Sequence, residues 1–288
     1  MSRLALLMMR LIHRLPVRLL RAGGAALGLL LYALAVPRRR VAWANIRACF
    51  PELDHAQQAR LVRATFICFA QSVLDRAVLW YGSAERLRSF VHVEGMELLD
   101  AAWGGPLILL APHFAGMEAG GIRLSIGKPP MMTMYSNQKD PLFNQALIDG
   151  RGRFQPDGVA VSRQDGARVA LRELKRGLPF YFLPDMDLGA RDAIFVPFFG
   201  VPAATVTAMS RLAQITGARV MPCITRMSEN GYTVTLHPAW ENFPTADAAA
   251  DTLRMNQFIE AQVRNMPAQY HWLHKRFKTR PPGAAPLY

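Results

Sequence analysis

The spacing of apolar residues changes along the 288-residue chain and predicts different structures for successive stretches. Leucines, methionines and arginines fill much of residues 1–21, and an uncharged run follows at 22–36. Residues 41–100 mostly place their apolar positions at helical spacing, which predicts a helical lead-in. After Gly105, short apolar runs alternate with amphipathic stretches, a pattern typical of alternating strands and helices.

This alternation predicts an α/β fold, with a mainly parallel sheet flanked by helices. The strands are expected at 107–111, 131–136, 158–162, 179–184, 193–199, 219–227 and 232–237. The helices of this part are expected at 141–150, 165–176, 203–216 and 247–265. No linker divides the region, so residues 41–288 are expected to form one domain, with a helical lead-in at 41–100 and an α/β core at 101–288.

Residues 1–40 form a candidate membrane segment. The uncharged run of fifteen residues is shorter than the roughly 20 that a spanning helix needs. Apolar neighbours could extend it past Arg18 and Arg21 if these side chains reach the surface. We therefore expect a membrane anchor or an interfacial helix. A cleaved signal peptide is an alternative, because Ala33-Leu34-Ala35 matches a small-residue cleavage pattern; a buried core helix is another.

The charge balance suggests an anionic partner. Lys and Arg total 34 against 21 Asp and Glu, a net charge of +13, which suits nucleic acid, acidic lipid or an acidic protein. No nucleic-acid-binding motif is present, so nucleic acid is not the expected partner. The three cysteines are widely spaced and fit neither a disulfide framework nor a zinc site, which indicates a reducing compartment.

His113 and Glu118 are the polar residues of an otherwise apolar stretch, PLILLAPHFAGMEAGG at 106–121. A ligand site is expected where a strand of an open α/β sheet ends and a helix begins. The two side chains can meet only if His113 precedes the helix and Glu118 lies in its first turns. A neutral imidazole oriented by a carboxylate is a general base, although a histidine at a strand end can also be purely structural. The glycines at 116, 120 and 121 would leave room for a substrate.

Several known catalytic motifs do not occur in the sequence. The Gly-x-Ser-x-Gly elbow of enzymes that form an acyl-enzyme on serine is missing. There is also no P-loop and no Gly-x-Gly-x-x-Gly fingerprint. Activation of a hydroxyl by a base therefore explains the His/Glu spacing better than covalent or nucleotide chemistry.

Four ordered segments resemble the glycerolipid acyltransferases, and in particular the branch that adds secondary acyl chains to lipid A in Gram-negative bacteria. The first is HFAGME, with the His-x4-acid spacing of that superfamily. The others are RRRVAWANIRACFPEL at 38–53, LPDMDLGARDAIFVPFFGVPAATVTA at 183–208 and PAQYHWLHKRFKTRPPG at 267–283. Together with the basic, apolar N-terminus they cover nearly the whole chain.

The resemblance implies an acyltransferase of the bacterial inner membrane, on its cytoplasmic face. Such an enzyme moves a fatty acyl group from an acyl carrier protein thioester to a hydroxyl of a phosphorylated glycolipid, a lipid A precursor. His113 would be the base and Glu118 its partner, with no cofactor and no metal. The residue chemistry agrees, because a thioester carries a good leaving group and needs only a base near the acceptor hydroxyl.

Arg151 and Arg153 follow the helix expected at 141–150. Their guanidinium groups could clamp a phosphate in bidentate fashion, with Arg151 the better candidate. The position loosely resembles the arginine-bearing second block of the family. Alternatively, both are basic residues favoured at a helix end by the helix dipole.

Asp185 and Asp187 form a D-x-D pair after the strand expected at 179–184. One reading is a divalent metal with a nucleotide sugar. The resemblance favours another, in which Asp185 organises nearby arginines, and Asp187 could simply cap a turn. Relatives often carry a polar residue where Met186 stands, which puts any amide or imidazole role there in doubt.

The C-terminal segment HWLHKRFKTRP is strongly basic. His271 and His274 could pair on one helical face, but no third metal ligand is apparent. A second group of residues, Lys275, Arg276 and Lys278, could bind a phosphorylated headgroup or an acidic carrier protein. A solvated basic helix end is the alternative.

Three further functions remain open at this stage. The same acyl transfer could use an ornithine-type lipid or a lysophospholipid as acceptor. A membrane-surface glycosyltransferase of the D-x-D type would instead depend on metal. A non-catalytic basic protein that binds anionic membrane would tolerate loss of His113.

Overall fold

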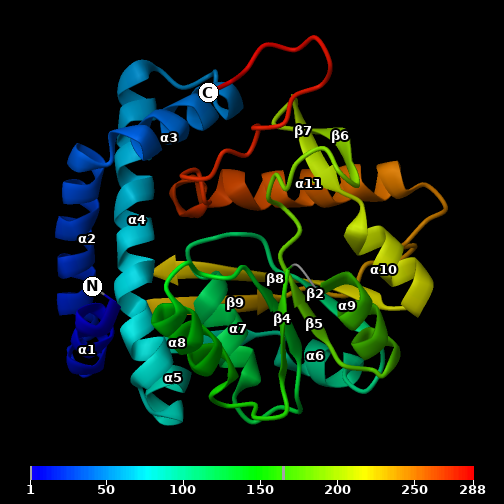
Figure 1. Ribbon diagram of the computed structural model, residues 1–288, viewed down its shortest axis with the longest axis horizontal. Helices are drawn as coiled ribbons and strands as arrows, with labels where there is room; N and C mark the ends of the chain where they lie inside the picture. Colours follow the sequence, from blue (N-terminus) through cyan, green and yellow to red (C-terminus); the bar gives the residue numbers. More distant parts are fainter. Residues whose placement is uncertain (1, 164–165) are drawn as a thin grey trace.

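The computed structural model describes residues 2–163 and 166–288, and within them a sheet of seven strands is covered by helices on both faces (Figure 1). Its strands are β1 (Val91–Glu94), β2 (Leu107–Leu110), β3 (Met132–Tyr135), β4 (Val159–Ser162), β5 (Phe180–Phe182), β8 (Arg219–Ser228) and β9 (Gly231–Leu236). They lie in the order β1-β9-β8-β2-β5-β3-β4. Every neighbouring pair is parallel except β8 with β9, so the predicted mainly parallel α/β sheet is confirmed.

The helices precede, connect and follow these strands. They are α1 (Ser2–Ile12), α2 (Val17–Leu34), α3 (Val36–Cys49), α4 (His55–Tyr81), α5 (Ala84–Phe90), α6 (Met96–Ala102), α7 (Met117–Ser125), α8 (Pro141–Gly152), α9 (Gly166–Lys175), α10 (Ala208–Thr216) and α11 (Ala248–Asn265). The helix expected at 165–176 corresponds to α9, although residue 165 itself lies outside the described residues.

Strand β2 illustrates why both faces of the sheet are covered. Its residues, LILL, are all fully buried. Ile108 and Leu110 belong to a core cluster that also contains Met255 and Ile259 of α11. Leu107 and Leu109 belong to the other cluster, with residues of α5 and α7. Because side chains alternate between the faces of a strand, an uninterrupted apolar run fits a strand buried on both sides.

Two segments differ from the sequence prediction. Residues 201–206 form β7 (Val201–Val206), which pairs antiparallel with β6 (Ala193–Phe198) in a separate hairpin, so the helix expected at 203–216 begins only at Ala208. The turn uses Phe199 and Gly200, both at positive φ, as a tight hairpin turn requires. Strand β1 interrupts the lead-in that was expected to be helical. Both strands are hard to predict from sequence. Strand β7 contains small residues and β1 is short, so neither shows a clear alternation of apolar and polar positions.

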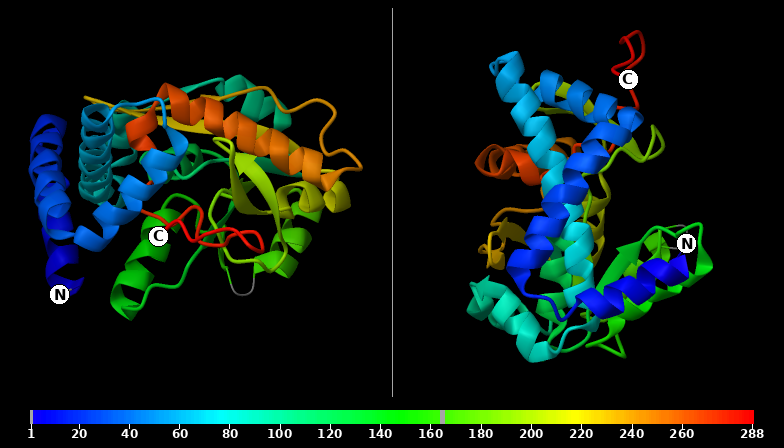
Figure 2. Two further views of the ribbon diagram at one scale, coloured as in Figure 1. Left: turned by 90° about the horizontal axis from the view of Figure 1, so that it is seen from above. Right: turned by 90° about the vertical axis from the view of Figure 1, so that its left-hand side faces the viewer.

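Helix α2 lies alongside α4 (Figures 1 and 2). The two helices approach so closely that a side chain at Gly28 would collide with the backbone of α4. An added Cβ there would lie 2.6 Å from the Cα of Ile67. Arg21, on the same face, donates to Asp75 of α4 at 2.5 Å, and Tyr232 donates to the same carboxylate at 2.6 Å. The opposite face of α2 exposes leucines, so the helix is only partly incorporated into the core.

The boundary predicted at residue 40 falls inside α3. Leu20 of α2 is buried in the same cluster as Val78 of α4, and residues of α1 pack against that cluster. The N-terminal helices therefore share core contacts with the α/β region. The division into an anchor and a catalytic domain stays a prediction.

The close approach of α2 and α4 predicts that Gly28→Ala destabilises the protein. Overlap with the α4 backbone should cost about 1–3 kcal/mol, or roughly 2–10 °C in Tm. Gly23→Ala is the matched control on the same helix, because its Cβ would meet only the Leu74 side chain at 3.7 Å. Alanine is the better helix former, so the control should leave Tm unchanged or raise it. Thermal unfolding of both variants in detergent measures the difference, and equal Tm values would contradict this packing.

Candidate active site

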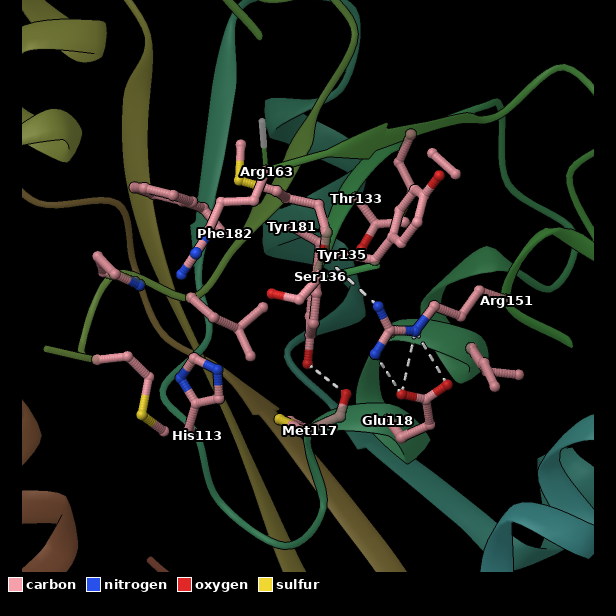
Figure 3. Close-up of a pocket in the computed structure, with 18 of the residues that line it drawn as sticks. His113, Met117, Glu118, Thr133, Tyr135, Ser136, Arg151, Arg163, Tyr181 and Phe182 are labelled. Atoms are coloured by element: carbon pink, nitrogen blue, oxygen red, sulfur yellow. Dashed lines mark hydrogen bonds and ion pairs between the residues drawn. The ribbon is translucent and has the colours of Figure 1, made fainter. Parts of the chain in front are cut away.

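A cavity of about 370 Å³ opens at the carboxyl ends of β2, β3, β4 and β5. His113 follows β2 and precedes α7, whereas Glu118 lies in the first turn of α7, as the sequence predicted. Figure 3 shows both side chains at this cavity, with Arg151 of α8 beside Glu118. Parallel strands bring their carboxyl ends to one edge of a sheet, which is why residues far apart in sequence meet here.

Asp185 holds His113 through both backbone and side chain. The Nδ1 of His113 lies 2.7 Å from Asp185 Oδ1, and the His113 backbone N–H donates to Oδ2 at 3.0 Å. An ionised carboxylate only accepts hydrogen bonds, so Nδ1 carries the proton. In the neutral imidazole this leaves the Nε2 lone pair free. Nε2 has no hydrogen-bond partner in the described part of the chain, and the imidazole lines the cavity.

The Asp185 carboxyl is fully buried yet ionised. Burial by itself raises its pKa, but the charge of His113 and the hydrogen bonds from that residue outweigh the effect and lower the pKa to about 2. The resemblance favoured Asp185 as the organiser of nearby arginines. Its hydrogen-bond partner is instead the histidine, and Arg276 contributes only a weaker charge interaction.

Glu118 is bound by an arginine and a tryptophan. Arg151 donates from Nε to both carboxylate oxygens at 3.1 Å and from Nη2 to Oε2 at 2.7 Å. Trp80 of α4 donates from Nε1 to Oε1 at 3.2 Å. Burial raises the pKa of Glu118, but Arg151 more than compensates, with smaller help from Arg76 and Trp80, and lowers the pKa to about 2. Glu118 is therefore ionised at pH 7.

No hydrogen bond joins His113 to Glu118 in residues 2–163 and 166–288; the two side chains share the cavity wall but have separate partners. The sequence predicted that Gly116, Gly120 and Gly121 leave room for a substrate, but two of the three have another role. An added Cβ at Gly116 would meet Thr225 of β8 at 2.6 Å, and one at Gly120 would collide with the same residue. These two glycines let α7 approach the strand, whereas Gly121 lines the cavity.

Arg153 lies away from the cavity and has a different role from the predicted one. It donates to the carbonyls of Leu79 and Gly82 at 3.1 and 2.7 Å. These carbonyls lie at the end of α4, where a helix has unsatisfied acceptors. Arg153 therefore caps α4, and a phosphate clamp formed by Arg151 and Arg153 together does not match this arrangement.

Both carboxylates of the D-x-D pair are used inside the protein. Asp187 accepts from the backbone N–H and hydroxyl of Thr279 at 2.6 and 2.8 Å and from Gly189 at 2.9 Å, which agrees with a turn-capping role. Asp185 is occupied by His113. Within the described ranges, no group of three or more His, Cys, Asp or Glu side chains is arranged to hold a metal ion.

The basic C-terminal segment does not form a helix after the short 3-10 turn η1 (Pro267–Gln269). Arg276 is buried and donates to the Ala204 carbonyl and the Thr205 hydroxyl at 3.1 and 3.0 Å, so it fixes β7 rather than a headgroup. Lys275 lies over the ring of Tyr288 at 5.3 Å. Lys275 and Lys278 are exposed and do not line either of the cavities described here.

His271 and His274 also line the cavity. Burial lowers the pKa of His271 to about 3 and that of His274 to about 4, with the charge of His113 adding to both effects. Both imidazoles are therefore neutral at physiological pH. They come from turns rather than from one helical face, which corrects the helical pairing considered from their spacing.

Sequence reasoning missed two contributors to the site. Trp80 supplies a hydrogen bond to Glu118 from α4, and Tyr181 of β5 donates from its hydroxyl to the Met117 carbonyl at 2.8 Å (Figure 3). Neither lies in a recognisable motif. Trp80 occupies an apolar position of a helix, so its periodicity predicts burial and nothing more.

Known proteins are similar in sequence to this chain over most of its length. Residues 2–279 match the family described as bacterial lipid A biosynthesis acyltransferase. The lipid A biosynthesis palmitoleoyltransferase of Escherichia coli (strain K12) is 28% identical over 280 residues, covering 96% of this chain and 90% of that protein. The myristoyltransferase of the same pathway and strain is 30% identical over 268 residues, covering 92% and 82%. A solved structure, the 1-acyl-sn-glycerophosphate acyltransferase PlsC from Thermotoga maritima, aligns with a TM-score of 0.41 at 14% identity, over 86% of this chain and 99% of that one.

The buried ion pair predicts a pH-dependent effect of Glu118→Gln. The pKa of Glu118 falls to about 2 in the folded protein, against roughly 4.3 for an unfolded glutamate. Its ionised form thus stabilises the fold above the unfolded pKa, and this contribution is lost as the pH falls through the folded pKa. We expect Glu118→Gln to lower the free energy of unfolding by on the order of 3 kcal/mol at pH 6. Its difference from wild type should shrink at lower pH.

Denaturant unfolding over a series of pH values tests this expectation. Glu229→Gln is the control, because Glu229 is exposed near the turn between β8 and β9. That control should follow the wild type throughout. A Glu118→Gln difference that stays constant from pH 6 to pH 2.5 would contradict the assigned ion pair.

Proposed function

The chain belongs to the bacterial lipid A biosynthesis acyltransferase family, and from that premise we propose that it transfers a fatty acyl group from an acyl carrier protein thioester to a hydroxyl of a lipid A precursor. The observation that carries the proposal is the orientation of His113. Its Nδ1 is held by a buried carboxylate, and its free Nε2 lies at a cavity with many apolar side chains. A general base needs this arrangement at the point where acceptor and donor meet.

In the proposed reaction, His113 Nε2 removes the proton of the acceptor hydroxyl as the oxygen attacks the thioester carbonyl. The tetrahedral intermediate collapses, the carbon–sulfur bond breaks, and the imidazolium returns the proton to the leaving thiolate. The products are an ester and a free thiol. Asp185 stabilises the imidazolium and fixes the tautomer, a role that needs its ionised form.

Glu118 acts in this proposal through Arg151. The carboxylate holds the guanidinium at Nε and Nη2, while Nη1 has only a long contact of 3.5 Å with the Met134 carbonyl. Arg151 lines the cavity and can stabilise negative charge that develops on the thioester oxygen. The direct His113–Glu118 pairing suggested by the sequence remains a prediction for the substrate-bound enzyme.

The cavity wall suits a hydrocarbon chain beside a few polar groups. Its apolar lining includes Met117, Ile122, Met131, Met134, Val159 and Leu183. Methionine side chains adapt to irregular apolar ligands. The lining also suits an acyl chain bound for an ornithine-type lipid or a lysophospholipid. The D-x-D glycosyltransferase alternative has no support in the geometry, because both aspartates already bind protein donors.

We also propose that α1 and α2 attach the protein to the cytoplasmic face of the inner membrane. Helix α2 is long and apolar enough to cross a membrane by length and composition, with a mean hydropathy of 1.5. One of its faces lies against α4, and the other exposes leucines, as does α1: Leu4, Leu7, Leu11, Leu19, Leu29, Leu30 and Leu34. Arginines on the same helices suit anionic headgroups.

The base assignment predicts that His113→Ala lowers the rate of acyl transfer by about 10²–10⁴-fold. Asp185→Asn should also be slow, because the amide cannot stabilise an imidazolium equally well. Since both changes disable one unit, the double variant should be no slower than His113→Ala alone. The assay follows ester formation by mass spectrometry, with acyl carrier protein thioester and lipid A precursor. His92→Ala is the control, because His92 is exposed on the edge strand β1. Wild-type turnover by a folded His113→Ala protein would refute the mechanism.

The membrane assignment predicts that Leu30→Glu weakens vesicle binding. Burying a leucine contributes about 1.5–3 kcal/mol, so its loss should reduce partitioning about 10-fold or more. The matched control is Ile215→Glu on α10, since Ile215 is 56% exposed and Leu30 is 53% exposed. Flotation with vesicles that contain anionic lipid measures both variants. Equal flotation of the two would show that the leucine face of α2 does not contact the bilayer.

A further inference from the structure

A second cavity, of about 500 Å³, adjoins the first one at His113. The two cavities share five lining residues: His113, Met117, Glu118, His271 and His274. The second extends toward α4 and the junction of α2 with α3, where it is lined by Arg38, Ser72 and Arg76 among others. The acyl transfer proposed above leaves this space unused.

Arg76 is the unusual residue of this cavity. Its Nε is buried without a hydrogen-bond partner, and in the described ranges of the chain no acceptor bonds to any part of its guanidinium. Burial lowers the pKa of Arg76, the Glu118 charge raises it, and the positive charge of Arg151 lowers it again. Arg76 as a whole is half-buried: Nε is fully buried, and the residue lines the cavity. A charged group that is partly withdrawn from water without a hydrogen-bond partner is costly, so the position needs an explanation.

Glu118 does not supply the missing partner. Its carboxylate already accepts three hydrogen bonds from Arg151 and one from Trp80. Two arginines thus face a single buried carboxylate, and the positive charge of Arg76 is in excess. Such an excess can be balanced by an anionic ligand.

Two neighbours add donors to the same cavity. His274 Nε2 is buried and has no partner among the described residues. Its imidazole, with a pKa lowered to about 4, is neutral at pH 7 and can offer one hydrogen bond without added charge. Arg38, which is largely exposed, uses Nη1 for the Leu273 carbonyl at 3.2 Å and retains other N–H groups.

We propose that the second cavity is a phosphate subsite, in which Arg76 and His274 bind a phosphate group of one substrate. The guanidinium fork matches phosphate oxygens, and the adjoining His113 lies where the reacting group of that substrate would be. This inference rests on the proposed function, because both substrates carry phosphate: the donor on its 4′-phosphopantetheine arm and the acceptor on its sugar. The first cavity, with its methionine and aliphatic side chains, then serves the acyl chain.

Matched substrates identify which phosphate is bound. Acyl-4′-phosphopantetheine is compared with acyl-pantetheine as donor, and a bisphosphorylated lipid A precursor with its monophosphorylated form as acceptor. Wild type should prefer one phosphorylated partner in kcat/KM by about 10–100-fold, the range of a charged hydrogen bond. Arg76→Met should abolish that preference, and the pair that loses it reveals the source of the phosphate. Arg76→Lys should retain part of it.

Stability distinguishes a binding role from a structural one. Because Arg76 lacks hydrogen-bond partners and is only a secondary charge neighbour of Glu118, Arg76→Met should change Tm little. Arg63→Met is the control on the same helix, exposed and outside both cavities, and should keep the wild-type preference. A fall in Tm with equal loss of rate on all four substrates would overturn the proposal, and so would an unchanged preference in Arg76→Met.

A binding measurement separates this proposal from the proposed function. Thermal shift is recorded with 4′-phosphopantetheine, glucosamine 1-phosphate, and their unphosphorylated forms. Wild type should be stabilised by at least one phosphorylated probe, and Arg76→Met by neither. If this holds but no acyl transfer is detected, the phosphate subsite stands and the proposed function fails. If acyl transfer occurs but no phosphorylated probe stabilises the wild type, the subsite is refuted and the function stands.

Discussion

The buried carboxylate of Glu118 imposes the main constraint on this molecule. A charge removed from water must be paired and hydrogen-bonded, or it destabilises the fold. Trp80, Glu118 and Arg151 satisfy the requirement from three different helices, α4, α7 and α8. One ion pair therefore fixes the relative positions of three helices around the carboxyl edge of the sheet.

His113 lies where two cavities meet, and both have mixed linings. Methionines and aliphatic residues line the first beside Glu118 and Arg151, and Arg38, Arg76 and Ser72 line the second beside leucine and phenylalanine side chains. Asp185 binds the imidazole at Nδ1, which leaves Nε2 available to groups bound where the two cavities join. Neutral His271 and His274 add polarity without adding competing charge.

Helix α4 links the site to the N-terminal helices. It contributes Arg76 to the second cavity and Trp80 to the hydrogen bonds of Glu118. Five residues before Arg76, Gln71 of α4 packs against Gly24 of α2. The bond between Arg21 and Asp75 lies next to Arg76 in sequence. Helix α4 is thus one continuous element between the contact with α2 and the second cavity.

Sequence alone determined the features that depend on local pattern. Apolar runs flanked by amphipathic stretches predicted the parallel sheet, and the position of His113 between a strand and a helix followed from the same pattern. The acyltransferase family also followed, but from the resemblance of four ordered segments rather than from the His/Glu pair alone. Two strands were not predicted because their patterns are weak: β7 contains several small residues, and β1 has only four residues.

The partners of those residues were decided only by the tertiary structure. Asp185 is 72 positions from His113 and Arg151 is 33 positions from Glu118, so no local periodicity relates them. Arg153 and Arg276 show the same limit: each looked available for phosphate in the sequence, yet carbonyl groups and a hydroxyl of the folded chain bind them instead. The type of a side chain and its spacing in the sequence indicate which kinds of group it can bind. Which partner it bonds depends on which groups folding removes from water together, and that is a property of the packed structure.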